Sequence, residues 1–252
     1  RNPWVPFILW PVQRQLVDAL RESFYKGEDI LISKSRDMGA SWLCSSFLHW
    51  LWLFRPDTQV REMSRTEDYV DGPTSKSLFW KHDAINVHLP EWMRPPNLEK
   101  GSKNRTKLRI HNELNGSTIA GESTTKHAMS GDRCTVLLLD EFSKVDDGQL
   151  IRTATADVTP CRIVNSTPSG AGTEYSRWKN SGQIKVFPLM FYDHPQKGKG
   201  RFVLKDTVKG TYHISSPWLE NERKRRTDRE IAQEILAEDL ETGEVFFDLK
   251  ML

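Results

Sequence analysis

Cysteine is scarce in this sequence, and its scarcity excludes two kinds of stabilising site. The 252 residues contain only three cysteines, Cys44, Cys134 and Cys161, which are widely spaced and each embedded in apolar sequence. An odd number at these spacings predicts neither a disulfide framework nor a zinc site. The composition therefore fits a protein of a reducing compartment.

Long apolar runs are also missing. The longest apolar stretch, residues 42–54, contains Ser45, Ser46 and His49 and is too short to cross a bilayer, so it is predicted to be a buried helix and no membrane partner is expected. No signal peptide precedes it, and the chain begins at Arg1 rather than at a methionine, which suggests a fragment of a longer protein.

The chain has little excess charge of either sign. A formal net charge of +2 is too small to indicate or exclude a nucleic-acid partner, so only local clusters of basic residues can do so. The hydrophobic content of 37% over 252 residues is enough for a proper core, which excludes a disordered chain and favours one α/β domain with an appendage.

Apolar segments of strand length alternate with segments of helical length. Because this order is typical of βαβ units, it predicts an α/β fold with a mostly parallel sheet and helices on both faces. A hairpin is expected at residues 108–120, with Asn115-Gly116 as its tight turn. Strands are expected at residues 29–33, 59–63, 134–139, 162–165 and 184–189, and helices at 11–25, 40–54 and 67–88, the last interrupted by Gly72-Pro73.

The character of the sequence changes after Tyr192. Residues 196–201 are basic and contain glycine, and residues 216–238 are highly charged and helical in composition. We therefore expect a core at residues 1–195 and a lid or linker subdomain at residues 196–252.

A loop able to bind phosphate follows the first predicted strand. The window from Lys34 to Ser41 keeps the second glycine, Gly39, and the terminal hydroxyl of the usual phosphate-loop pattern, but its lysine stands at the first-glycine position. From there a flexible ammonium can still reach the β and γ oxygens, and Ser41 can bind Mg²⁺. Arg36 is a second cation for phosphate or a solvated loop residue, and alone the pattern favours a structural turn.

Two adjacent acids end the apolar run at residues 134–139. Asp140 would hold Mg²⁺ and Glu141 would activate the water that attacks the γ-phosphate, since ligands of open α/β sheets lie at the carboxyl ends of the strands. One acid could instead be a helix N-cap, an explanation that fits two adjacent acids less well. Next, the strand at 162–165 runs into Ser166, Thr167 and Pro168, which could sense the γ-phosphate or form a bare turn.

These three elements, in this order, resemble the ATPase domain of the large terminase subunit of tailed double-stranded DNA bacteriophages, a P-loop NTPase of the ASCE, RecA-like type. That family carries the basic residue of its phosphate loop early, as Lys34 and Arg36 do here. Residues 7–13 resemble the adenine-recognising segment, with Gln13 reading the base edge and Trp10 or Phe7 packing nearby; a surface glutamine is the equally simple alternative. The resemblance thus implies an Mg²⁺-dependent ATPase whose nucleotide is bound by Gln13, Trp10, Ser35, Arg36, Asp37, Met38, Gly39, Ala40, Ser41 and Trp42.

The resemblance continues to the end of the chain. Residues 165–168 with Gly170 and Gly172 match the coupling motif, and residues 230–234 and 243–246 resemble the segment that leads to the family's nuclease domain, which this sequence does not contain. The implied function is packaging of double-stranded DNA into a preformed capsid in the host cytoplasm. The implied partners are DNA, the portal protein, the small terminase subunit and further copies in a homo-oligomeric ring, the isolated chain possibly being a monomer.

One family feature is absent. Similar terminases carry an arginine before a glycine upstream of the acidic strand, where it reaches a neighbouring subunit's nucleotide, but here residues 128–131 contain none. Arg133, Lys126 and Arg152, in that order, are the candidates for this trans-acting residue, although a solvated surface position is the simpler reading of each.

Two clusters of basic residues are candidates for DNA contact. Sequence-independent binding to phosphates would suit them, but charged runs on helices are usually solvated faces. Two other functions stay open: a helicase-like ATPase, which would need a second RecA-like domain, and a non-catalytic assembly subunit with a degenerate nucleotide fold, which the displaced lysine supports. The first cluster comprises Lys197, Lys199, Arg201 and Lys205, and the second Arg223, Lys224, Arg225 and Arg226.

Overall fold

A mostly parallel sheet forms the centre of the computed structural model, which describes residues 7–124, 133–205 and 211–240. Its strand order is β3-β4-β5-β2-β6-β7-β1-β8, with parallel pairing from β5 to β8 and antiparallel pairing of β3 and β4 at one edge. This is the predicted α/β arrangement. The strands are β1 (Ile30–Lys34), β2 (Gln59–Ser64), β3 (Arg105–Thr106), β4 (Arg109–His111), β5 (Thr118–Ser123), β6 (Val136–Asp140), β7 (Arg162–Ser166) and β8 (Lys185–Leu189).

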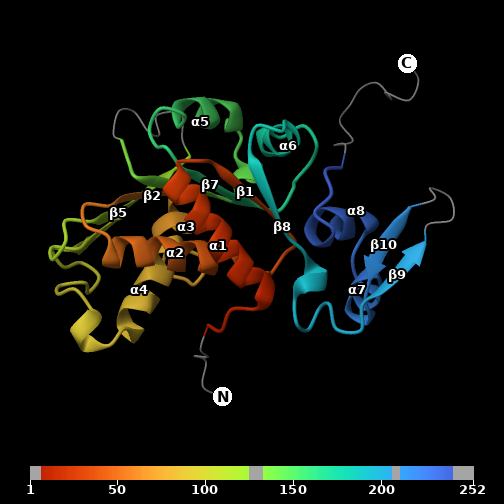
Figure 1. Cartoon of the computed structure of the whole chain (residues 1–252), viewed down its shortest axis with the longest axis horizontal. Coiled ribbons are helices and arrows are strands. Elements are labelled where there is room, and N and C mark those ends of the chain that lie inside the picture. The colour runs from red at the N-terminus through yellow and green to blue at the C-terminus, as the bar shows by residue number, and fades with distance from the viewer. Residues whose placement is uncertain (1–6, 125–132, 206–210, 241–252) are drawn as a thin grey trace.

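Helices cover both faces of the sheet (Figure 1). One face packs against α1 (Pro11–Lys26), α2 (Ala40–Phe54) and α4 (Leu78–His88), with α3 (Glu67–Asp71) beside them. The other face packs against α5 (Gly148–Ala154) and α6 (Glu174–Asn180). Short 3₁₀ turns lie at Glu91–Met93, Phe142–Lys144 and Phe191–Asp193.

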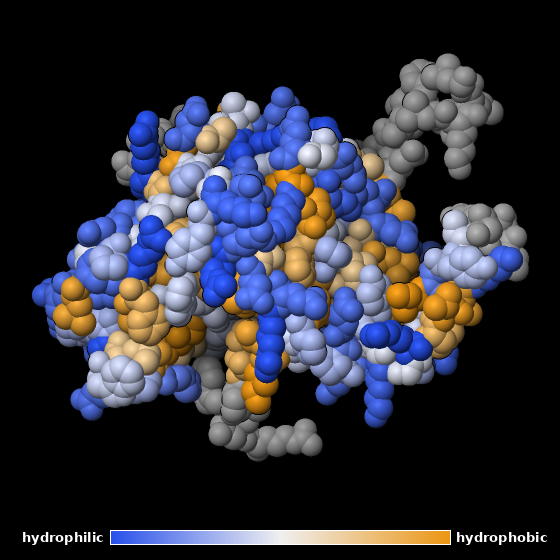
Figure 2. Space-filling model, in the orientation of Figure 1, coloured by the Kyte–Doolittle hydropathy of each residue, from blue (hydrophilic) through white to orange (hydrophobic). Residues whose placement is uncertain are grey.

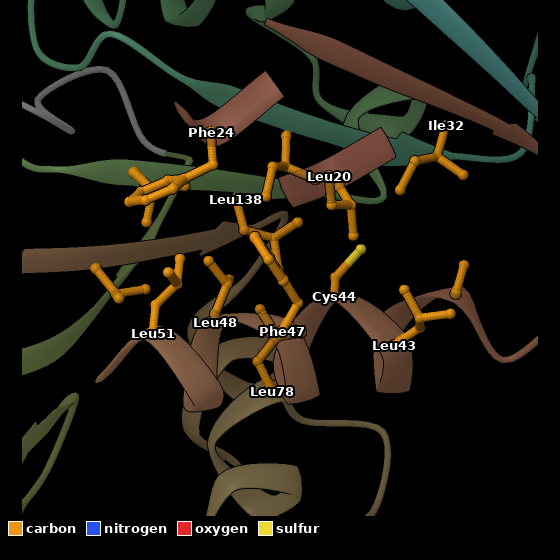
Figure 3. Close-up of a cluster of buried hydrophobic side chains, with 14 of the residues drawn as sticks. Leu20, Phe24, Ile32, Leu43, Cys44, Phe47, Leu48, Leu51, Leu78 and Leu138 are labelled. Atoms are coloured by element: carbon orange, nitrogen blue, oxygen red, sulfur yellow. The ribbon is translucent and has the colours of Figure 1, made fainter. Parts of the chain in front are cut away.

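The alternation of side chains along the central strands produces these two cores. In β1, Ile30 and Ile32 point into the larger core, which Figure 3 shows between α2 and the sheet, whereas Leu31 points into the core beneath α5 and α6. All five residues of β1 and of β6 are buried, which is why these strands read as continuous apolar runs. Burial on both faces fixes their register and therefore the places where they end.

A smaller apolar cluster lies at the C-terminal end of the described chain. Phe191, Leu219, Ile231 and Ile235 pack together there, joining α7 (Pro217–Arg223), α8 (Asp228–Glu230) and a π-helical turn at Ile231–Ile235. The antiparallel hairpin of β9 (Phe202–Lys205) and β10 (Tyr212–Ser215) extends from this region and exposes apolar side chains (Figure 2).

Several expectations need correction. The β4–β5 hairpin exists, but it is not closed by a two-residue turn: the Asn112 N–H donates to the Ser117 carbonyl, which leaves four loop residues, of which Gly116 has a φ of 77°. The predicted helical region at 216–238 is divided into α7, α8 and the π-helical turn. In addition, β3, β9 and β10 were not predicted. Among the described helices, none combines the length and apolarity that a membrane crossing needs.

Candidate functional site

The loop after β1 lies where three neighbouring parallel strands end. β1, β7 and β6 are adjacent in the sheet, so Lys34, Ser166 and Asp140 share one edge of it. α2 begins at Ala40 directly after Gly39, whose φ of 72° is the left-handed conformation that glycine adopts without strain. A β-carbon at Gly39 would lie 3.1 Å from the Gln13 amide nitrogen, so the close approach of α1 also requires glycine.

The displaced lysine occupies the centre of this edge. The Lys34 ammonium lies 3.5 Å from the Glu141 carboxylate and 3.5 Å from the Thr167 hydroxyl, and its side chain is only 9% exposed. It thereby connects the acidic pair after β6 with the segment after β7. An ammonium at this position can reach an anion bound in the loop, as the sequence predicted.

Three oxygen-bearing side chains gather beside the start of α2. The Ser41 hydroxyl lies 3.2 and 3.3 Å from the two Asp140 carboxylate oxygens, and the Asn165 amide nitrogen lies 2.5 Å from Asp140 and 3.3 Å from Ser41. Burial raises the pKa of Asp140, and the nearby charge of Glu141 raises it further. Asn165 was not predicted as a site residue, because only its pairing with Asp140 across the β6–β7 register brings it here.

Glu141 has an unusual backbone conformation. Its φ of 54° and ψ of 36° lie in the left-handed region, which costs a non-glycine residue of the order of 1 kcal/mol. Burial alone would raise the pKa of its carboxyl, but the charges of Lys34 and Lys144 outweigh burial and lower it. The Lys144 ammonium lies 2.6 Å from the carboxylate. Glu141 is therefore held in its ionised form beside Lys34.

The loop and the acids line one polar cavity of about 390 Å³. Arg65, Tyr69, Lys76 and Lys81, from the segment between β2 and α4, line its opposite side. These residues were not predicted, since nothing in their local sequence pattern points to a ligand. The phosphate-loop residues that line the cavity are Lys34, Arg36, Asp37, Met38, Gly39, Ala40, Ser41 and Trp42.

Two residues of the loop bind the C-terminal subdomain instead. Ser35 is 1% exposed, and its hydroxyl donates to the Ile235 carbonyl at 2.5 Å and accepts from the Phe191 N–H at 2.8 Å. This excludes a free Ser35 side chain at the phosphates, although its backbone remains in the loop. The Arg36 guanidinium lies 2.6 Å from Glu234, with which it forms an ion pair.

The side chain of Gln13 is fully engaged with the chain itself. Its amide oxygen accepts from the Trp10 N–H at 3.1 Å, its amide nitrogen donates to the Met38 carbonyl at 3.0 Å, and the residue is 1% exposed. The ring of Trp10 packs against His194 with centroids 4.1 Å apart. Gln13 therefore ties α1 to the phosphate loop, a contact that the expectation of base reading did not include.

The candidates for a trans-acting cation lie away from this cavity. Arg133 is exposed before β6, at the opposite end of that strand from Asp140. Arg152 forms an ion pair with Glu174 at 2.8 Å and lies 4.7 Å from the Trp178 ring. Lys126 and the stretch 128–131 lie outside the described residues.

Several of the basic residues expected at DNA have partners within the chain. The Lys197 ammonium donates to the Arg36 and Asp37 carbonyls at 2.6 and 3.3 Å, so Lys197 supports the phosphate loop, and burial lowers its pKa. Arg225 and Arg226 both pair with the buried Glu222. The remaining members, Lys199, Arg201, Lys205, Arg223 and Lys224, are exposed.

A protein-family model accounts for most of the chain. The family described as "Terminase large subunit, T4likevirus-type, N-terminal" matches residues 31–252. This chain belongs to the large-terminase family. The search of curated proteins found no match.

Solved terminase structures share the fold. The large terminase of bacteriophage HK97 matches at 17% identity and a TM-score of 0.63, covering 94% of this chain and 52% of its own. The ATPase domain of the Thermus phage P74-26 large terminase matches at 17% and 0.53, covering 94% and 95%. A thermophilic bacteriophage large terminase in complex with ADP matches at 11% and 0.56, covering 92% and 54%. The terminase chain studied here thus spans about half the length of the longer terminases, and its predicted fold class is confirmed.

Proposed function

We propose that this terminase chain hydrolyses ATP with Mg²⁺ and that the hydrolysis powers translocation of double-stranded DNA into a capsid. The observation that carries the proposal is the meeting of Lys34, Asp140 and Glu141 at the ends of adjoining strands beside the loop. A cation for the phosphates, a carboxylate for a metal and a carboxylate for a water are the parts that phosphoryl transfer to water needs.

The fit of Mg²⁺ rests on the donors present. Ser41 and Asp140 supply hard oxygen ligands, and the Asn165 amide oxygen is buried without a hydrogen-bond partner nearby. When bound, Mg²⁺ would neutralise charge on the β- and γ-phosphates. Asn165 would hold Asp140 in place through its amide nitrogen.

Each remaining side chain has a defined part. Glu141, kept ionised by Lys34 and Lys144, would accept the proton of the attacking water. Lys34 would transfer its contact from Glu141 to the γ-phosphate, and Arg36 would leave Glu234 to bind a phosphate oxygen. The segment Ser166, Thr167 and Pro168 would respond to the loss of the γ-phosphate, because Thr167 contacts Lys34.

The wider functional assignments remain proposals of the same account. We place the boundary between the ATPase core and the lid or linker subdomain at residues 195 and 196. DNA, the portal protein, the small terminase subunit and a homo-oligomeric ring in the host cytoplasm are the proposed partners and setting. An arginine from a neighbouring copy, with Arg133 as the first candidate, would complete each site.

Comparing binding with turnover tests the catalytic assignment. Wild type, Glu141→Gln and the control Glu220→Gln, which alters an exposed acid on α7, are compared for ATP affinity and Mg²⁺-dependent phosphate release. The proposal predicts that Glu141→Gln binds ATP like wild type but loses turnover at least 100-fold, whereas the control keeps both. Absence of ATP binding by the wild type would favour the non-catalytic assembly subunit instead.

A further inference from the structure

Ser143 makes a concentration of buried hydrogen bonds two residues after Glu141. It is 3% exposed and lies in the 3₁₀ turn Phe142–Lys144. Its N–H donates to the Ser166 hydroxyl at 3.1 Å, and its own hydroxyl donates to the Thr167 carbonyl at 2.6 Å. The Ser166 hydroxyl also lies 2.8 Å from the Ser143 hydroxyl, and the Ser169 hydroxyl donates to the Ser143 carbonyl at 2.6 Å.

All of these bonds connect the turn after β6 to the segment after β7. The far side of that segment is fixed, because the buried Tyr175 hydroxyl donates to the Ser166 carbonyl at 3.1 Å and to the Ile32 carbonyl at 3.3 Å. Ser143 therefore ties the residues that follow Glu141 to an anchored strand end. No other part of its side chain is available to solvent or to the nucleotide cavity.

This connection matters because of the conformation of Glu141. The chain leaves β6 through the left-handed backbone of Glu141, a conformation that persists only where the surroundings enforce it. The Lys144 N–H returns to the Glu141 carbonyl at 3.0 Å, so the turn closes directly on Glu141. The side of the turn that faces β7 is held by Ser143.

The same bonds connect Glu141 with the lysine of the loop. Thr167 contacts the Lys34 ammonium with its hydroxyl and the Ser143 hydroxyl with its carbonyl oxygen. A displacement of Lys34 or Thr167 is therefore transmitted through one backbone carbonyl to the turn that carries Glu141. Ser143 also lines a separate hollow of about 850 Å³ between α5 and the loop before α6, so its absence would leave room for the turn to move.

Resting on the proposed hydrolysis, we propose that Ser143 is a positioning residue, which fixes the Glu141 carboxylate against the attacking water and couples its position to Thr167. Ser143 touches neither nucleotide nor water in this role. Its loss should therefore lower the turnover number while leaving nucleotide binding intact, because binding depends on the loop and on Lys34. A misplaced base commonly loses a factor of ten or more in rate.

The test compares Ser143→Ala with Ser117→Ala. Ser117 is equally buried and its hydroxyl likewise donates one bond, to the Arg55 carbonyl, and accepts one, from the Thr58 N–H, but it lies in the β4–β5 loop at the other end of the sheet. Both variants should lose similar thermal stability. We expect Ser143→Ala to keep its ATP Kd within twofold and to lose at least tenfold in kcat, and Ser117→Ala to keep both.

A double-mutant cycle identifies the route. If Ser143 acts through Ser166 and Thr167, Ser143→Ala combined with Ser166→Ala should lose little more kcat than either alone, since the two hydroxyls form one network. An active wild type whose kcat is unchanged by Ser143→Ala, or reduced equally by Ser117→Ala, would overturn the role of Ser143 alone. A wild type that binds ATP without turnover would contradict the proposed hydrolysis and this role with it.

Discussion

The amide nitrogen of Asn165 lies 2.5 Å from a carboxylate oxygen of Asp140, its register partner on the adjacent strand. Because this bond also favours the ionised carboxylate, Asn165 supports the ligand set proposed for Mg²⁺. We predict that Asn165→Ala raises the Mg²⁺ concentration for half-maximal ATP turnover about tenfold or more. Titration of Mg²⁺ at saturating ATP measures this, and an unchanged midpoint in a folded variant would exclude such a role for Asn165.

The sequence predicts the central part of this site well. Continuous apolar runs place β1 and β6, and the residue types at their ends, Lys34 and the Asp140–Glu141 pair, carry chemistry that does not depend on distant contacts. The fold class follows from the same alternation. What the sequence cannot supply is the register between strands, and for this reason the approach of Asn165 to Asp140 appears only in the structure.

Contacts between distant segments account for the other differences. Lys197 reads as part of a basic cluster, but the fold carries it to the carbonyls of the phosphate loop. Gln13 reads as a base-binding side chain or a surface residue, yet both ends of its amide find partners inside the chain. The β9 strand shows no apolar alternation because all four of its residues are exposed. Local patterns contain no information on such packing.

Gln13 offers a test of base recognition. Since its amide supports the loop through Met38, we predict that Gln13→Ala weakens ATP and GTP binding by the same factor, about fivefold, from the loss of buried hydrogen bonds. Titration of both nucleotides into wild type and variant gives the ratio of Kd values. Selective loss of ATP affinity would show instead that Gln13 reads the adenine edge.

The ion pair of Arg36 with Glu234 opposes nucleotide binding. Arg36 must leave Glu234 to reach a phosphate, and a half-exposed pair of this kind contributes at most about 1 kcal/mol. Glu234→Gln should therefore bind ATP up to about fivefold tighter. The matched control is Glu22→Gln, which removes surface pairs with Lys26 and Lys185. Weaker ATP binding by Glu234→Gln would mean that the pair helps to form the loop.

Asp71 gives the stability of the sheet edge a pH dependence. Burial would raise its pKa, but bidentate hydrogen bonds from the buried Arg105 outweigh burial and lower the pKa below its ordinary value. A carboxyl whose folded pKa is depressed stabilises the protein above its unfolded pKa, about 4, and this stabilisation is lost as the pH falls through the folded pKa.

Asp71→Asn should accordingly destabilise the fold by about 3 kcal/mol near neutral pH, because it leaves Arg105 with an incomplete buried pair. The difference between wild type and variant should shrink as the pH falls below about 4. Urea unfolding at several pH values measures both effects, with the exposed Asp18→Asn as the control. A difference that is independent of pH would disprove the linkage.

The most direct test of the central claim is Mg²⁺-dependent ATP hydrolysis measured over a series of protein concentrations for wild type, Glu141→Gln and Lys34→Ala. The account predicts turnover by the wild type that rises faster than linearly with concentration, as expected when a neighbouring copy completes the site, and collapse of turnover in both variants. Equal inactivity of all three proteins, with no ATP binding at the highest concentration, would contradict it.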